Sequence, residues 1–241
     1  MARLNTFYLA PSLWREPFVL GGEEAHHLTR VLRAKTGQEV RLMDGQGRTG
    51  LFRILGMDKK EVRLARISEN EAPAPAFPLV LAVGWAKNIR RGFLLEKAVE
   101  LGAAGIWFWE AERSQGAPPD QGKDGWERQL VAAAKQCGTS WLPEIRSLGG
   151  PRDVIDAAAG FSCRVLCWEH EQTRIIHPDD LTHAGGTVAV LGPEGGLEQK
   201  EAQIFQAHDF APRTLGPNIL RFETAAVFLL SLRLWNATRP R

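Results

Sequence analysis

The alternation of apolar and polar positions over residues 1–70 predicts a small β-rich domain. Three segments alternate with the two-residue period of half-buried strands, at residues 39–43, 49–55 and 61–67. Turn residues such as Asp44-Gly45 separate them, which is typical of hairpins. Residues 23–34 instead carry Ala25, Leu28, Val31 and Leu32 at helical spacing, which predicts a short amphipathic helix. We therefore expect one helix and an antiparallel sheet in this part.

A proline-rich stretch at residues 70–78 separates this domain from a different pattern. It has no helix or strand periodicity, and the linker predicted there divides the chain into domains 1–72 and 73–241. Beyond it, apolar runs typical of buried strands lie at residues 79–83, 106–109, 164–168, 187–191 and 211–215. Helical patterns separate them at residues 91–101, 125–136, 152–158 and 197–207. This alternation predicts an α/β domain with a parallel sheet covered on both faces.

The last predicted helix, at residues 223–236, is apolar on nearly every side. A helix of this kind is normally buried on all sides. In a domain this small, part of the apolar surface can be buried against a second copy of the chain, so we expect a homodimer.

Length and composition describe an ordinary globular protein. The chain has 241 residues, of which 44% are hydrophobic, enough for a packed core. No apolar stretch reaches membrane-spanning length and the N-terminus lacks the features of a secretory signal, so we expect a cytoplasmic protein with no membrane partner. Three cysteines are too few to staple the fold, and disulfides are not expected.

Cys163, Cys167, His170 and His177 invite a zinc-site hypothesis. Their spacing matches no familiar zinc module, and both thiols belong to one predicted strand, where they point to the same face of the sheet. We therefore interpret them as small apolar side chains and predict no metal.

Positive charge is concentrated near the N-terminus. Residues 1–70 contain 12 Lys and Arg against 8 Asp and Glu, although the whole chain carries a formal net charge of only +2. Such an excess suits a domain that meets phosphate groups, and a solvated surface without a partner is the alternative.

One glycine-bearing segment, residues 100–105, superficially resembles the nucleotide loop of a Rossmann fold. That loop must follow a strand and open a helix. Here a predicted helix comes first and Gly102 is a natural stop at its end. We interpret this segment as a helix C-terminus.

Residues 191–197, which we name the glycine loop, have the order that a ligand loop requires: strand, then glycines, then helix. Gly192, Gly195 and Gly196 allow close approach of a ligand to the main chain, or a tight structural turn. The loop has no Lys-Ser/Thr ending, and Glu194 would repel a phosphate. A neutral or cationic ligand fits better.

Residues 215–225, which we name the arginine loop, have a similar order. A turn at Leu215-Gly216 leads to apolar Ile219 and Leu220, which could enclose a flat ring. Arg221 and Glu223 flank the start of the apolar helix; they could stabilise a developing anion and accept a proton, or form a structural ion pair with helix capping. We expect both loops at the C-terminal ends of neighbouring parallel strands, where α/β sheets bind ligands.

Seven segments, taken in order, resemble one family over essentially the whole chain. They are His27-Leu28-Thr29-Arg30-Val31-Leu32-Arg33, residues 95–102, Glu112-Arg113-Ser114, residues 134–138, residues 142–145, the Gly-Pro-Glu-Gly-Gly of the glycine loop and the Leu-Gly-Pro-x-Ile-Leu-Arg-x-Glu-Thr-Ala of the arginine loop. The chain resembles the RsmE family of 16S ribosomal RNA (uracil-N3)-methyltransferases in the SPOUT superfamily.

The resemblance implies a small PUA-like β-barrel domain that binds RNA, followed by an α/β methyltransferase domain with a C-terminal trefoil knot. It implies a homodimer that binds S-adenosyl-L-methionine, releases S-adenosyl-L-homocysteine, needs no metal and methylates N3 of a uridine in 16S rRNA of the small ribosomal subunit, near the decoding centre. The residues that it maps to the cofactor loops, together with those we assign beside them, are Leu191, Gly192, Glu194, Gly195, Gly196, Leu215, Gly216, Ile219, Leu220, Thr224 and Ala225.

Uracil N3 carries a proton that must leave for methylation, so we predict Arg221 as electrostatic stabiliser and Glu223 as base or orienting group. The predicted RNA-binding residues are His26, Arg30, Arg33, Lys35, Arg41 and Arg113, with Lys59 and Lys60 beside them. Thr139 occupies the position where the family usually has an arginine. If that arginine helps to hold substrate RNA or a neighbouring subunit, Arg113 or Arg146 could supply the same contact. Two alternatives stay open: a noncatalytic RNA-binding protein that keeps the fold, and a related ribose 2′-O-methyltransferase.

Overall fold

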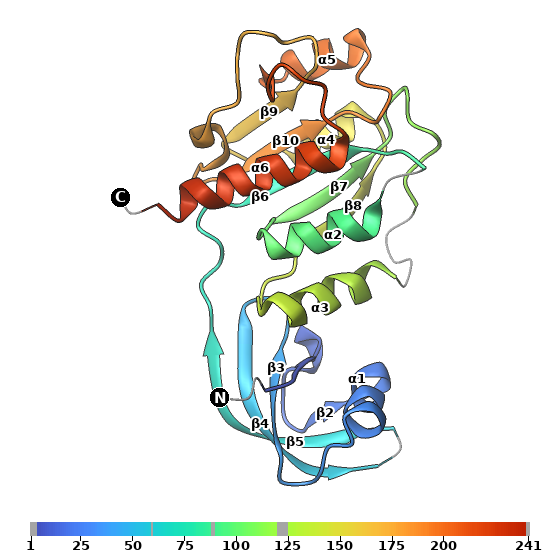
Figure 1. The fold of residues 1–241 in the computed structure, drawn as a ribbon, viewed down its shortest axis with the longest axis vertical. Helices are drawn as coiled ribbons and strands as arrows, with labels where there is room; N and C mark the ends of the chain where they lie inside the picture. Colours follow the sequence, from blue (N-terminus) through green and yellow to red (C-terminus); the bar gives the residue numbers. More distant parts are fainter. Residues whose placement is uncertain (1–3, 59, 88–89, 120–124, 240–241) are drawn as a thin grey trace. The chain divides into compact units, whose positions relative to one another are not determined.

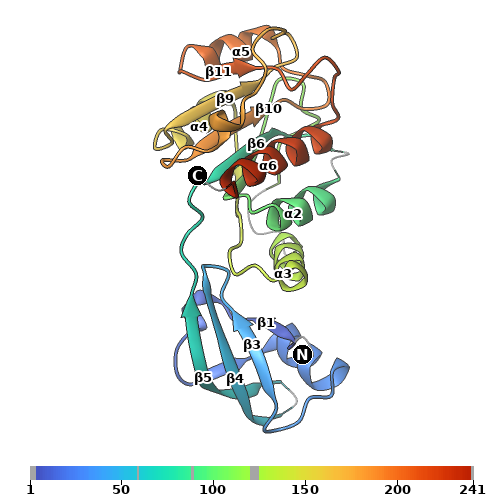
Figure 2. The same ribbon diagram turned by 60° about the vertical axis from the view of Figure 1, so that its left-hand side comes forward.

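The computed structural model describes residues 4–58, 60–87, 90–119 and 125–239 (Figure 1, Figure 2). The chain forms two compact units. One contains residues 1–74 and 131–142, and the other contains residues 75–130 and 143–241. The predicted division into domains 1–72 and 73–241 assigned the segment 131–142 to the second domain. In the structure this segment belongs to the first unit.

The first unit is built on a five-stranded sheet with the order β1-β3-β4-β5-β2. Its strands are β1 (Thr6–Tyr8), β2 (Phe18–Leu20), β3 (Glu39–Met43), β4 (Arg48–Met57) and β5 (Val62–Glu71). All pairs are antiparallel except β1 and β3, which are parallel. The segments predicted at 39–43, 49–55 and 61–67 are β3, β4 and β5, and they pair antiparallel as predicted. The parallel pair of β1 with β3 was not predicted, because a three-residue strand is too short to show an alternation. β5 also continues into the predicted linker.

The predicted helix at 23–34 is shorter and changes type along its length. In the structure this segment forms α1 (Gly22–His26), followed directly by a π-helical turn, η2 (His27–Val31). A separate short 3₁₀ turn, η1 (Pro11–Leu13), lies before β2. The wider π turn takes Val31 out of the buried stripe that Ala25 and Leu28 form, leaving it 60% exposed. Arg33 then has a positive φ of 50°, so helical geometry has ended before Ala34.

The returning segment 131–142 contains the C-terminal part of α3 (Trp126–Cys137) and the turn after it. Lys135 Nζ donates to Glu24 Oε1 at 2.8 Å. The amide of Gly47 donates to the Ser140 carbonyl at 3.0 Å, and the amide of Leu142 donates to the Gly45 carbonyl at 2.9 Å. These bonds attach the segment to α1 and to the β3–β4 turn.

The second unit is an α/β domain with a six-stranded, fully parallel sheet. Its strands are β6 (Leu79–Gly84), β7 (Gly105–Trp109), β8 (Glu144–Leu148), β9 (Cys163–Cys167), β10 (Thr187–Leu191) and β11 (Ala211–Arg213), in the order β11-β9-β10-β6-β7-β8. A short 3₁₀ turn, η3 (Pro178–Leu181), lies between β9 and β10. The predicted α/β class with a parallel sheet is confirmed, with β8 as an additional strand.

Helices cover both faces of this sheet. Alternate residues of β6 separate the two cores: Leu79, Leu81 and Val83 pack with α2 (Arg91–Glu100) and α6 (Phe222–Ala237), which lie side by side in Figure 1. Val80 and Ala82 pack on the other face, with α4 (Pro151–Ala157) and α5 (Gln199–Gln206). In sheets covered on both faces in this way, ligands bind at the carboxyl ends of the strands.

The last helix, α6, is buried on one side only within this chain. Leu229 and Leu230 lie in the core, whereas Phe228 is 38% exposed and Trp235 is 51% exposed. Arg233 is buried and donates Nε to the Phe77 carbonyl at 2.9 Å, and burial lowers its pKa. Among the described helices, none has both the length and the apolar character needed to span a lipid bilayer.

Candidate active site

A pocket of about 630 Å³ opens at the carboxyl ends of β9, β10 and β11. Its size is typical of small-molecule sites, and its position is where ligands bind parallel sheets. Three segments line it: Cys167, Trp168 and Glu169 at the end of β9, residues 191–196 of the glycine loop at the end of β10, and residues 214–222 with Ala225 after β11.

The glycine loop and the arginine loop come together in this pocket. Of the predicted cofactor residues, all except Thr224 line it. We expected the two loops to follow neighbouring strands, and this was wrong. β9 pairs with both β10 and β11 and lies between them. The third lining segment, Trp168-Glu169, was missed since it contains no glycine; its signal was a polar residue directly after a predicted strand.

Backbone hydrogen bonds hold Thr214, the residue before the arginine loop, against the β9–β10 connection. The amide of Thr214 donates to the Arg174 carbonyl at 2.9 Å, and the amide of Ile176 donates to the Thr214 carbonyl at 2.9 Å. The Thr214 hydroxyl also donates to the Gly216 carbonyl at 3.1 Å. The loop therefore enters the pocket with its first residues fixed.

Arg221 and Glu223 flank Phe222, the first residue of α6 and one of the residues that line the pocket. Arg221 is the N-cap residue, is exposed and lines the pocket, whereas Glu223 is half-buried in the first turn. Within the described residues, neither side chain forms an ion pair or a capping hydrogen bond. The described structure therefore does not have the alternative of a structural ion pair between them. Arg221 lines the pocket, whereas Glu223 is not among the lining residues.

The predicted RNA-binding residues fall in two places. Five of them, all exposed in the first unit, are His26, Arg30, Arg33, Lys35 and Arg41. Lys60 is exposed in the same unit, and Lys59 lies outside the described residues. Arg113 belongs to the second unit, where Nε donates to Glu198 Oε1 at 2.8 Å and Nη1 donates to the Gly195 carbonyl at 2.7 Å.

The position of Thr139, where the family usually has arginine, lies in the turn after α3. Its hydroxyl accepts a hydrogen bond from the Trp141 amide at 3.3 Å. The residues considered as substitutes already have partners: Arg113 as described, and Arg146 with Glu144 at 2.9 Å and with the ring of Trp107.

The cysteines of β9 are apolar packing residues. Cys163 and Cys167 pack on the same face of the sheet as Val165. Burial raises the pKa of the Cys163 thiol, and it raises the pKa of Cys167 to about 12. Within the described ranges, no group of three or more His, Cys, Asp or Glu side chains is placed to hold a metal ion.

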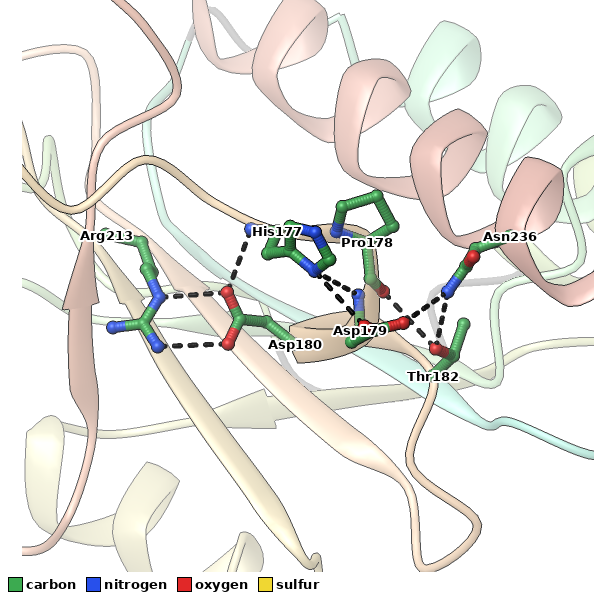
Figure 3. Close-up of polar contacts among 7 residues, drawn as sticks. All are labelled: His177, Pro178, Asp179, Asp180, Thr182, Arg213 and Asn236. Carbon is green, nitrogen blue, oxygen red and sulfur yellow. Dashed lines mark hydrogen bonds and ion pairs between the residues drawn. The ribbon is translucent and has the colours of Figure 1, made fainter.

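A polar network lies behind the arginine loop and is shown in Figure 3. Arg213 binds Asp180 through two hydrogen bonds, from Nε at 2.9 Å and from Nη2 at 3.0 Å. The His177 amide also donates to Asp180 at 2.9 Å, and Asn236 Nδ2 donates to Asp179 and Thr182 at 3.1 and 2.9 Å. The network thus joins β11, η3 and the end of α6 directly before the arginine loop.

Asp180→Asn should lower stability near neutral pH by about 1–3 kcal/mol, because it weakens a bidentate, charge-assisted contact. Burial raises the pKa of Asp180, but the hydrogen bonds from Arg213 and His177 outweigh it, and the pKa lies below the ordinary 3.8. A depressed folded-state pKa contributes stability above the unfolded value and loses it as the pH falls. The difference between wild type and variant in urea unfolding should therefore shrink once the pH drops below 3.8; a difference that stays constant would contradict the assignment.

The comparisons with known proteins agree on the class of protein that this fold and site define. Residues 72–233 match the family described as RNA methyltransferase domain, and residues 20–65 match the RNA methyltransferase PUA domain. The ribosomal RNA small subunit methyltransferase E of Mesomycoplasma hyopneumoniae is 32% identical over 75% of this chain and 79% of its own length.

Two crystal structures have the same fold over nearly the whole chain. A probable rRNA-methyltransferase from Porphyromonas gingivalis is 29% identical with a TM-score of 0.82, over 95% of this chain and 96% of that one. A ribosomal RNA small subunit methyltransferase E from Neisseria gonorrhoeae, bound to S-adenosyl methionine, is 25% identical with a TM-score of 0.79 over the same shares.

The fold and the matched domains define an RNA methyltransferase that carries a PUA domain. The chain belongs to the ribosomal RNA small subunit methyltransferase E family, RsmE. This confirms the family and the SPOUT-type α/β fold with a PUA-like domain that the sequence resemblance implied. The trefoil knot, which the resemblance also implies, stays a prediction.

Proposed function

We propose that this protein transfers a methyl group from S-adenosyl-L-methionine to N3 of a uridine in 16S ribosomal RNA. The observation that carries the proposal is the pocket itself, in which the glycine loop and the arginine loop meet at the carboxyl edge of a parallel sheet. Family membership supports the same reaction class. Ribosomal RNA as substrate implies that the protein works in the cytoplasm, where small subunits are assembled.

The pocket residues fit S-adenosyl-L-methionine better than a nucleoside phosphate. The charged side chains of the lining are two carboxylates, Glu169 and Glu194, and one guanidinium, Arg221. This excess of negative charge favours a cationic ligand over a polyanion. Apolar Leu215, Ile219 and Leu220 could enclose the adenine ring, and the glycine loop offers backbone groups. We propose that the predicted cofactor residues hold the ligand in this way, with Thr224 acting through its place in α6.

When bound, S-adenosyl-L-methionine supplies an electrophilic methyl group on a sulfonium and leaves as S-adenosyl-L-homocysteine. The chain's own residues must remove the N3 proton of the uracil and stabilise the charge that this leaves on the ring. Removing the N3 proton leaves negative charge on the ring carbonyls, which the Arg221 guanidinium at the pocket rim can stabilise. The Glu223 carboxylate, two residues further along α6, is the proposed acceptor of that proton or the group that orients the base.

The exposed basic residues of the first unit form the proposed RNA surface. His26 and Arg30 lie on α1 and the π turn, followed by Arg33 and Lys35, and Arg41 lies on β3. Cations on a PUA-like domain would hold phosphates without reading sequence, whereas the pocket would select an unpaired uridine.

We propose that the working form is a homodimer whose contact includes the exposed side of α6. Phe228 and Trp235 are the large apolar side chains exposed on this helix in the single chain. Light scattering should give about twice 26.7 kDa for the wild type, and Phe228→Glu with Trp235→Glu should give a monomer, because two charges would be buried in an apolar contact. A monomeric wild type at micromolar concentration would refute the proposal.

Calorimetry with S-adenosyl-L-methionine separates the enzyme from a noncatalytic RNA-binding protein of the same fold. The proposal expects one saturable site per chain, with competition by S-adenosyl-L-homocysteine because both ligands share the adenosine moiety. Absence of binding by the folded protein would favour the noncatalytic alternative. The ribose 2′-O-methyltransferase alternative is decided by the position of the methyl group in the product.

A further inference from the structure

Arg113 follows β7 in the chain, yet its side chain lies against the glycine loop after β10. Nη1 donates to the Gly195 carbonyl at 2.7 Å, and Nε donates to Glu198 Oε1 at 2.8 Å. Gly195 lines the pocket, and Glu198 is the N-cap residue of α5. One guanidinium therefore joins the ligand-facing loop to the helix that the loop opens.

The stem of Arg113 also occupies the space beside Gly195. A Cβ atom added to Gly195 would lie 3.2 Å from Arg113 Cβ, which is tighter than ordinary van der Waals contact, and 3.4 Å from Arg113 Cδ. Gly196 has a φ of +74°, and a Cβ there would meet the carboxylate of Glu169. Glu169 Oε1 in turn accepts from the Leu197 amide at 3.3 Å. The two glycines thus leave room for two side chains that contact the loop: Arg113, which is not among the lining residues, and Glu169, which lines the pocket.

The turn that carries Arg113 is held by hydrogen bonds that do not involve the guanidinium. Glu201 is buried, and its carboxylate accepts from the Glu112 amide and from the Glu198 amide, both at 2.9 Å. Ser114 Oγ accepts from the Ala111 amide at 2.9 Å. Because the turn and the N-terminus of α5 share one buried carboxylate, Arg113 is presented to the glycine loop in a defined position.

The exposure of Arg113 indicates that its role is geometric. Its side chain is 47% exposed and that of Glu198 is 35% exposed, and ion pairs in such surroundings contribute little to stability. The bond to the Gly195 carbonyl, however, fixes the direction of a peptide group in the wall of the pocket. Nε and Nη1 donate in these contacts, so within the described residues Nη2 is the nitrogen that keeps both of its N–H groups for another acceptor. A phosphate that drew the guanidinium towards itself would break the bond to Gly195 and release the loop.

We propose that Arg113 is a positioning residue that holds the glycine loop in its ligand-binding shape, and that it is not an RNA-binding residue. The inference rests on the proposed binding of S-adenosyl-L-methionine in the pocket. It replaces our sequence-based assignment of Arg113 to the RNA surface. Lysine cannot reproduce the role, because a single ammonium lacks the planar fork that reaches a carbonyl and a carboxylate together.

Calorimetry with S-adenosyl-L-methionine on wild type, Arg113→Ala and Arg113→Lys tests the inference. Arg113→Ala should weaken cofactor binding by about tenfold or more, and Arg113→Lys should fall between the two. Affinity for small-subunit RNA should stay that of the wild type. The slope of log K against log salt should also be unchanged, since the loss of one phosphate contact would lower it by about one.

Lys200→Ala is the matched control. It removes the ion pair of Lys200 with Glu112 at 3.1 Å, at the same turn but away from the glycine loop, and should bind the cofactor like the wild type. If wild type fails to bind the cofactor, the proposed function is wrong. If wild type binds and Arg113→Ala binds equally well, or if Arg113→Ala loses RNA affinity with a shallower salt dependence, the inference about Arg113 is overturned.

Discussion

Arg221→Ala should lower turnover by about 100- to 1000-fold, the effect typical of removing one preorganised group that stabilises developing negative charge. Arg221 lines the pocket, is exposed and has no ion-pair partner within the described part of the chain, so its charge is available to the uracil carbonyls. The measurement is single-turnover methyl transfer with saturating cofactor and RNA. Cofactor affinity by calorimetry should change much less than turnover.

Arg152→Ala provides the control for this variant. Arg152 is an exposed arginine on α4, which packs on the opposite face of the sheet from α6. Removing it takes away the same charge and should leave turnover at the wild-type level. Unchanged turnover in Arg221→Ala would remove Arg221 from the mechanism, and a loss of cofactor binding as large as the loss of turnover would make it a binding residue.

Gly84→Ala should weaken cofactor binding by at least about tenfold, or 1.4 kcal/mol, without touching the inside of the pocket. A Cβ atom at Gly84 would lie 2.5 Å from the Pro193 nitrogen and 2.8 Å from the Gly192 carbonyl carbon. These are backbone atoms of the glycine loop, so the loop itself has to move. Overpacking of this kind should also cost about 1–3 kcal/mol of stability, measured by urea unfolding.

Gly92→Ala is the matched substitution in the same unit. Near Gly92, in the first turns of α2, the closest atom to an added Cβ is a flexible Gln129 side-chain oxygen at 3.8 Å, which is ordinary contact. Alanine favours the helix over glycine by up to about 1 kcal/mol, so this variant should be as stable as wild type or more so, with full cofactor binding. Wild-type cofactor affinity in Gly84→Ala would show that the glycine loop does not set the shape of the site.

Apolar patterning predicted the parts of the fold that are buried on both sides. β6 and β10 are continuous apolar runs packed between two helical layers, and their sequences show it directly. β8, Glu-Ile-Arg-Ser-Leu, escaped prediction because it is an edge strand with mixed polar positions and only partial burial. The π turn at 27–31 was also beyond the pattern, since helical spacing does not distinguish α from π geometry.

The two pocket loops were predictable because glycines mark places where the chain turns sharply after a strand. The order of the strands was not, because periodicity carries no information about which strands pair, and β9 proved to lie between β10 and β11. Contacts between distant segments are equally invisible in a single sequence. The bond from Arg113 to Gly195 joins residues 82 positions apart, and it changed the role that we assign to Arg113.

The most direct test of the central claim is mass spectrometry of small-subunit ribosomal RNA from a strain that lacks this protein. The account predicts that one 3-methyluridine is absent in that strain, returns with the wild-type gene and does not return with Arg221→Ala at matched expression. An RNA with its full set of base methylations, or one that lacks a ribose 2′-O-methyl group instead, would contradict the account.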